Sequence, residues 1–301
     1  MENVVKVDSV EMNEKKPKAS TSLWGHAWKQ LKSDKYALIS MIVVSLYALV
    51  AVASFLGIFA SDWDKQFVDS YTGPSLDYLF GTDIFGRSVF LKTLKGAEVA
   101  MSVGLITAII SMIIGVTLGA IAGFFGGRVD EFIVWFYTTF SSIPYIMLLV
   151  AITFILGKGI VAVYLALGLS SWVNLCRLIR GEVIRHKDRE YVHAASAIGV
   201  SQMSRLFKHI IPNVLHIVII NFSLQFQTAI KSEVILSYLG LGVQGRPSWG
   251  TMINDAKQEL AQGVWWQLAA ATIAMFFIVL AFNTLGDALR DALDPKLKGK
   301  N

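Results

Sequence analysis

Cysteine, proline and charge are all scarce in this chain. Its 301 residues include one cysteine, Cys176, and six prolines, and only 16% are charged. A single cysteine excludes an intrachain disulfide and a metal cluster held by several thiolates. With 54% hydrophobic residues, the chain is too apolar for an ordinary soluble domain. The sequence also lacks the alternating polarity of a transmembrane β-barrel, so we expect an all-α polytopic membrane protein.

Motifs for catalysis and ion coupling are also missing. No G-x-x-x-x-G-K-[ST] motif occurs, and Gly157-Lys158-Gly159 lacks the rest of it, so we expect no ATP hydrolysis and no bound cofactor in this chain. A membrane serine hydrolase is disfavoured because Gly168-Leu169-Ser170-Ser171 has no second glycine. Of the six long apolar runs in the sequence, only the fifth, at residues 214–241, contains histidine or charged residues: His216, Lys231 and Glu233. Energy coupling is therefore expected to come from another subunit.

Six apolar runs are long enough to span a bilayer, since about 20 residues at 1.5 Å each cross the hydrocarbon core. We expect six transmembrane helices, at residues 37–60, 99–127, 132–157, 159–176, 214–241 and 263–286. Lys231 and Glu233 interrupt the fifth run, which leaves its end open. Pro144 is expected to kink the third.

The charges beside these runs predict the orientation. Lys32 and Lys35 precede the first run, whereas Asp62 and Asp64 follow it. Because basic residues favour the cytoplasmic side, both termini are expected in the cytoplasm. The expected cytoplasmic segments are 1–36, 177–213 and 287–301, and the expected extracytoplasmic loops are 61–98 and 242–262. The net charge of +5 is explained in this way, and we expect membrane lipid but no nucleic acid as a partner.

Two groups of residues within the runs suggest roles. Gly115, Gly119 and Gly123 recur every four residues and share one helix face, which favours close packing of another helix. Polar amides inside a span usually face other helices or a wet cavity. The amides of the fifth run are candidates for a translocation path, with helix packing as the alternative: Asn221, Gln225 and Gln227.

The cytoplasmic segment 177–213 contains two predicted helices. Asp188 is expected to cap a slim, alanine-rich helix at 189–197, and Gly199 to stop it. A second, amphipathic helix is expected from Ser201 to Ile211, with Pro212 ending it. The two would form a compact knob at the membrane surface. Periodicity leaves open the alternative of an interfacial loop that only carries positive charge.

Four pieces of the chain resemble a known family. The sequences EYVHAASAIG at 190–199 and HIIPN at 209–213 resemble the EAA loop of permease subunits of bacterial ABC importers. Further pieces resemble the second permease subunit of the oligopeptide, dipeptide and nickel branch. They are GTDIFGR at 81–87, SYLGLGVQ at 237–244 with PSWG at 247–250, and LGDALRDALDP at 285–295.

The resemblance implies a type I importer permease of six helices in a bacterial inner membrane. It would pair with a second related permease, two ATPase subunits that use ATP and Mg²⁺, and an extracytoplasmic substrate-binding protein. Alternating access would move di- or oligopeptides; a stand-alone channel or secondary carrier is the alternative. The ATPase-coupling residues carried over from the family motif are Glu190, His193, Ala194, Ala195, Gly199 and Pro212.

One position departs from the family pattern. His193 stands where the motif has glutamate, just before the alanine pair. An ion pair made from that position in the family is not expected here. A histidine there would make contact with the ATPase sensitive to pH.

Overall fold

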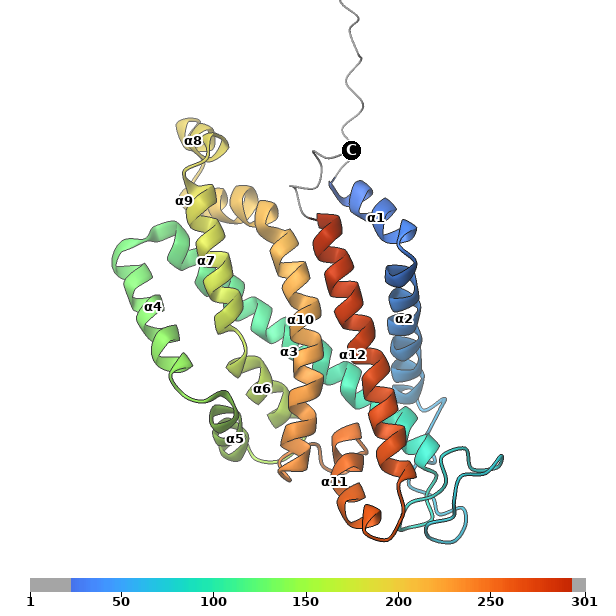
Figure 1. The fold of residues 1–301 in the computed structure, drawn as a ribbon. Helices are drawn as coiled ribbons and strands as arrows, with labels where there is room; N and C mark the ends of the chain where they lie inside the picture. The colour runs from blue at the N-terminus through green and yellow to red at the C-terminus, as the bar shows by residue number, and fades with distance from the viewer. Residues whose placement is uncertain (1–22, 294–301) are drawn as a thin grey trace, which may run out of the picture.

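The computed structural model describes residues 23–293, and the predictions for residues 1–22 and 294–301 of the two tails lie outside this range. In the described part the chain is helical, and β-structure is limited to the isolated bridges Gln66–Arg87 and Thr82–Ser88 (Figure 1). An all-α polytopic fold is therefore confirmed.

Five stretches of helix in residues 23–293 are long and apolar enough to cross a membrane, or six if a bent pair counts as one span. The spanning elements are α2 (Lys35–Phe55), α3 (Val89–Phe125), α4 (Gly127–Ser141) with α5 (Tyr145–Leu156), α6 (Ile160–Ser170) with α7 (Val173–Lys187), η1 (Arg205–Ile210) with α10 (Ile211–Tyr238), and α12 (Trp266–Leu293). The shorter helices are α1 (Leu23–Ser33), α8 (Glu190–Ala197), α9 (Gln202–Ser204) and α11 (Trp249–Leu260).

Helix α3 begins ten residues before the predicted span 99–127, so the end of the expected loop 61–98 is helical. The Ser88 hydroxyl caps it by accepting a hydrogen bond from the backbone N–H of Leu91. This stretch resembled a loop because the sequence from Ser61 to about Gly96 is polar and rich in turn residues, and charged residues continue into the first turns of α3. They are compatible with helix because Lys92 and Glu98 are buried in ion pairs.

The third and fourth predicted spans are each broken. Helices α4 and α5 meet at Pro144 with a bend of 92°, so the predicted kink is present as a full break. The run predicted at 159–176 consists of α6 and α7, interrupted at Ser171 and Trp172. Helix α7 continues to Lys187, so the first third of the expected loop 177–213 is helix.

Two details of the predicted knob are wrong. Asp188 ends α7, and the cap position of α8 is Arg189, whose side chain makes no capping bond. Pro212 does not end a helix, because residues 202–238 form one continuous helical stretch. It contains a π-helical section, η1, in which the backbone N–H of Ile211 bonds to the carbonyl of Leu206. This wider turn accommodates a proline that has no N–H of its own to donate.

Other boundaries shift by only a few residues. The first predicted span, 37–60, is shorter as α2, and the last, 263–286, continues as α12 to Leu293. Gly199 follows α8 with φ +82°, a left-handed conformation that stops a helix, which confirms that part of the prediction.

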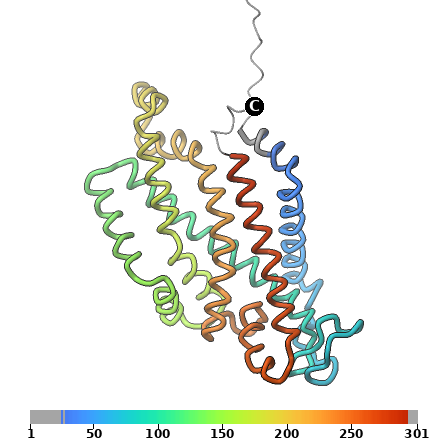
Figure 2. Tube along the Cα trace, viewed as in Figure 1, coloured from blue at the N-terminus to red at the C-terminus, as the bar shows by residue number. Residues whose placement is uncertain are grey.

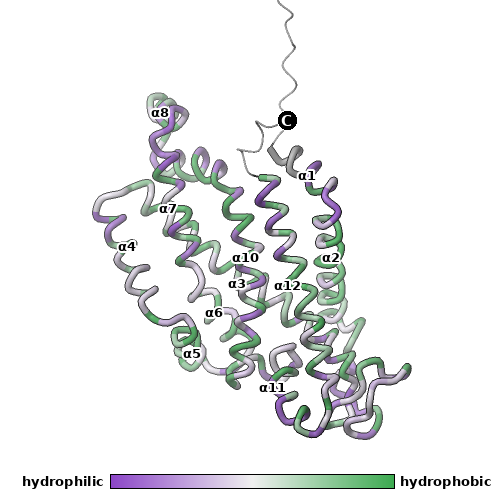
Figure 3. The backbone as a smooth tube through the Cα atoms, viewed as in Figure 1, coloured by the Kyte–Doolittle hydropathy of each residue, from purple (hydrophilic) through white to green (hydrophobic). Residues whose placement is uncertain are grey.

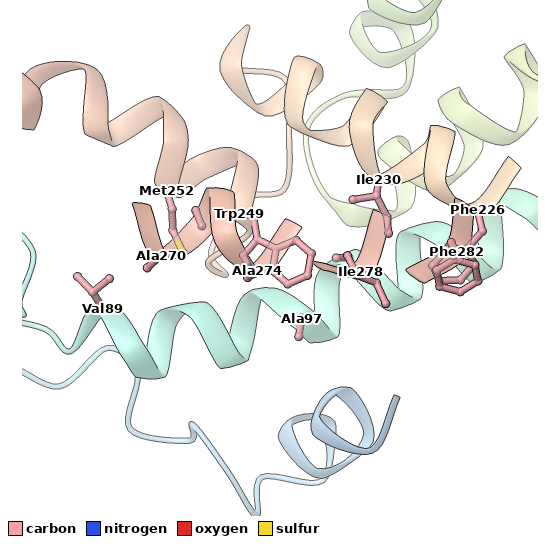
Figure 4. Packing of buried hydrophobic residues seen from close by; sticks show 12 residues of the cluster. Val89, Ala97, Phe226, Ile230, Trp249, Met252, Ala270, Ala274, Ile278 and Phe282 are labelled. Carbon is pink, nitrogen blue, oxygen red and sulfur yellow. The ribbon is translucent and has the colours of Figure 1, made fainter. Parts of the chain in front are cut away.

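Helix α3 crosses the bundle diagonally and packs against α7, α10, α2 and α6, while α10 packs against α12 (Figure 2). Their largest shared core lies where α3, α10, α11 and α12 meet (Figure 4). Phe226 and Phe282 stack there with ring centroids 3.9 Å apart, and Trp249 is buried against Ala97. Hydrophobic residues follow the long helices, and hydrophilic ones gather at the two ends of the bundle (Figure 3).

Candidate functional site

Helix α8 projects from one end of the bundle, the end that also carries α1 (Figure 1). Only its inner face is buried: Val192 belongs to a core cluster with Leu206 of η1 and side chains of α7, and Ala195 is also buried. The outer face is exposed and includes Glu190, His193 and Ala194. The predicted residues of α8 therefore divide into one anchor, Ala195, and an exposed surface.

The exposed surface of α8 ends in an apolar side chain that sequence reasoning missed. Ile198 is 81% exposed, directly before the Gly199 turn. A Cβ on Gly199 would meet no atom within 4 Å, so its left-handed φ, not lack of space, accounts for glycine here. Pro212 is exposed but belongs to α10 and not to this surface. The exposed position of Ile198 could have been inferred from the sequence, because this isoleucine directly precedes the glycine that stops the helix.

A second feature is a cavity of about 450 Å³ at the two broken spans. Its walls come from the α4–α5 break, the α6–α7 break and one face of α10. The lining residues are Phe140, Ser141, Ser142, Ile143, Pro144, Tyr145, Leu148, Ser170, Ser171, Val173, Asn174, Gln225 and Thr228. None of them is charged, and most carry a hydroxyl or amide group.

Of the three predicted amides, only Gln225 lines this cavity. Its side-chain nitrogen is buried and has no hydrogen-bond partner among the described residues. Asn221 instead donates to the carbonyl of Ile217 in its own helix at 2.9 Å. Gln227 is 5% exposed and lies away from the cavity among packed helices. The serines of the two breaks were missed because they do not form a pattern along the sequence.

The three predicted seam glycines face helix α7. A Cβ on Gly119 would lie 2.5 Å from the carbonyl oxygen of Cys176, closer than any real contact allows. Gly115 and Gly123 meet the carbonyl oxygens one turn before and one turn after, those of Trp172 and Arg180. The glycines of α3 are therefore spaced every four residues like the carbonyl groups of α7 that they face, and the backbones of the two helices are in contact.

At the end of the bundle opposite to α8, a buried ion pair joins the loop before α3 to the helices. Asp83, 1% exposed, lies 2.9 Å from the Lys92 ammonium, which also donates to Gln267 of α12 at 2.8 Å. Burial alone would raise the pKa of Asp83, but attraction to Lys92 and Arg87 brings it below its ordinary value. The Trp266 indole donates to the Thr82 carbonyl at 2.9 Å. These bonds tie residues 81–87 to α3 and α12.

Glu259 of α11 lies close to this ion pair. It is 2% exposed, and one carboxylate oxygen has no hydrogen-bond partner among the described residues. Burial raises the pKa of Glu259 to about 7; Lys92 opposes this rise, and Asp255 and Asp83 add to it. This carboxyl therefore changes its charge near neutral pH, unlike an exposed glutamate.

Two family models match parts of the chain. Residues 115–299 match the family described as "Binding-protein-dependent transport system inner membrane component". Residues 22–74 match the "N-terminal TM domain of oligopeptide transport permease C".

Curated relatives match nearly the whole chain. The oligopeptide transport system permease protein OppC of Bacillus subtilis is 37% identical, over 95% of this chain and 93% of the relative. The dipeptide transport system permease protein DppC of the same organism is 35% identical, over 93% and 88%. A glutathione transport system permease protein, GsiD of Escherichia coli, is 34% identical, over 94% of each chain.

A solved structure shares the fold. A chain from the MetNI methionine ABC transporter, in an inward facing conformation, aligns with a TM-score of 0.54 and 17% identity. The alignment covers 67% of this chain and 96% of that chain.

Proposed function

The chain belongs to the family of binding-protein-dependent transport system inner membrane components, and from that premise we propose that it passes di- or oligopeptides across a bacterial inner membrane. It is a multi-pass permease subunit of an ABC importer, a transporter component and not an enzyme. The peptide substrate is proposed because two of the relatives are named for oligopeptide and dipeptide transport.

The end that carries α8 and α1 would face the cytoplasm. Basic side chains collect there, which fits the rule that cytoplasmic segments are positive. They include Lys29, Lys32, Arg185, Lys187 and Lys208. The loop at the other end, residues 56–88, has only two basic residues, Lys65 and Arg87, against five aspartates. This charge difference supports an arrangement with both termini in the cytoplasm.

Helix α8 would transmit force from an ATPase subunit. The observation that carries this proposal is its geometry: two buried side chains, Val192 and Ala195, fix it to the bundle, and an exposed apolar tip at Ile198 is free for a partner. Small exposed alanines allow close approach to a groove. ATP with Mg²⁺ would be bound and hydrolysed by two partner ATPase subunits. His193 is exposed on the same surface and would contact the same partner.

The remaining partners follow from the family. A second related permease would complete the path, and an extracytoplasmic binding protein would deliver substrate to the end that carries α11. Closure of the ATPase dimer would push α8, and the bundle would alternate between outward-open and inward-open states. A stand-alone channel or secondary carrier is not favoured, since the relatives are ABC transporter permeases.

Peptide uptake by the reconstituted complete transporter tests this proposal. Ala194→Trp adds bulk to the exposed face of α8 without touching its anchor, and it should abolish ATP-dependent uptake while the chain still inserts and pairs. The matched control is Lys29→Trp, on exposed helix α1 at the same end, which should leave uptake unchanged. Uptake by this chain alone, or full uptake by the Ala194 variant, contradicts the coupling role.

A further inference from the structure

The cavity at the two broken spans has a chemical character that the family assignment does not explain. Both spans break next to it, at 142–144 and at 171–172, and α10 closes the third side. A break in a spanning helix exposes backbone groups and tends to line a cavity. A volume of about 450 Å³ is large enough for part of a small peptide.

The wall of this cavity offers neutral hydrogen-bonding groups. Ser170 and Ser171 lie at the end of α6, Asn174 lies in the first turn of α7, and Gln225 and Thr228 come from one face of α10. The hydroxyls of Ser170, Ser171 and Thr228 donate to carbonyls of their own helices, so toward a ligand they act as acceptors. The buried Gln225 amide nitrogen has no partner in the described part of the chain and is available as a donor. Hydroxyl and amide groups bond to peptide N–H and C=O groups regardless of the side chains those carry.

Charged residues stand at the edges of the cavity instead of in its wall. Arg177 of α7 donates to the hydroxyl of the lining residue Ser141 at 3.3 Å, on the side toward α8, and stacks on the ring of Tyr137. Lys231 is exposed on α10, three residues beyond Thr228 and toward the other end of the bundle. Between these two positions the lining is uncharged.

We propose that this cavity is a peptide main-chain binding site, in which neutral side chains led by Gln225 hold the backbone of the substrate and ignore the charge of its side chains. The inference rests on the proposed function, since it describes how the peptide passes. A charged wall would favour one class of peptide, because it attracts side chains of opposite charge and repels side chains of like charge. A neutral wall accepts acidic, basic and neutral peptides alike.

The test places a charge of either sign at one position. The complete transporter, with its binding protein and ATPase subunits, is reconstituted in vesicles, and ATP-dependent uptake of Ala-Lys-Ala, Ala-Glu-Ala and Ala-Ala-Ala is measured. Gln225→Glu should raise the ratio of lysyl to glutamyl peptide uptake by about fivefold, and Gln225→Lys should lower it by about fivefold. Gln225→Leu, which removes the amide without adding charge, should reduce uptake of all three peptides alike.

The two variants of opposite charge, Gln225→Glu and Gln225→Lys, control for damage to the fold, because a misfolded permease loses uptake of every peptide equally. If both Gln225 variants are inactive, Thr228→Glu and Thr228→Lys decide instead, since Thr228 is exposed and lines the same wall. An unchanged ratio in both members of an active pair overturns the inference. Failure of the unaltered transporter to take up any peptide would instead overturn the proposed function.

Discussion

Replacing Glu259 by glutamine should make the protein more stable at alkaline pH. The carboxyl of Glu259 is buried beside Lys92 and Asp83, and its pKa is raised to about 7 from an ordinary value of 4.5. The folded chain therefore holds this proton more tightly than the unfolded chain does. Stability from this group is present below pH 4.5 and is lost as the pH rises to about 7.

The size of the effect follows from the two pKa values. A rise from 4.5 to about 7 corresponds to about 3 kcal/mol of unfolding free energy between pH 4 and pH 8, as an upper estimate. Glutamine has nearly the shape of the protonated acid but cannot ionise. Glu259→Gln should thus differ little from the unaltered protein at pH 4 and exceed it by about 3 kcal/mol at pH 8.

Thermal unfolding in detergent between pH 4 and pH 8.5 measures this difference. At about 2–4 °C per kcal/mol, the midpoint of the variant should lie about 6–12 °C higher at pH 8. Glu131→Gln is the matched control, because Glu131 is exposed on α4 and its loss should leave the pH dependence unchanged. Parallel curves for Glu259→Gln and the unaltered protein, or a less stable variant at pH 8, would refute the reasoning.

Two further predictions concern the packing and the buried ion pair. Gly119→Ala should lower the unfolding free energy by about 1–3 kcal/mol, because the new Cβ meets the Cys176 carbonyl. The control Gly181→Ala, with open space around it, should be neutral or stabilising. Equal thermal midpoints for the two variants would contradict the close approach of α3 and α7. Asp83→Asn should cost about 3–5 kcal/mol by leaving the Lys92 ammonium buried without its counter-ion, and adding Lys92→Met should restore most of the loss in the same melting assay.

The sequence predicted features that depend on local composition. Long apolar runs indicated the spanning helices, Pro144 indicated a bend, and Gly199 indicated the end of α8. The four-residue spacing from Gly115 to Gly123 indicated a close approach on that face. In each case the physical cause lies within a few residues of the effect.

Features that depend on contacts distant in sequence were not predictable. The helical start of α3 requires Asp83 to neutralise Lys92, and no local rule reveals that this lysine is buried. Continuity of the helix through Pro212 depends on a π-turn packed against α8 and α7. The cavity joins serines of two breaks with Gln225, which lies more than 50 residues further along the chain.

The continuous helix from Gln202 to Tyr238 would act as a lever if α8 has the proposed coupling role. At 1.5 Å per residue its 37 residues reach about 55 Å, from the seat of α8, past Gln225 and Thr228, to the buried Glu233–Ser237 hydrogen bond. Under the proposed coupling role, a push on α8 reaches the cavity wall through the helix against which α8 packs. The π-turn beside Pro212 lies between the α8 contact and Gln225, so the push would pass through it first.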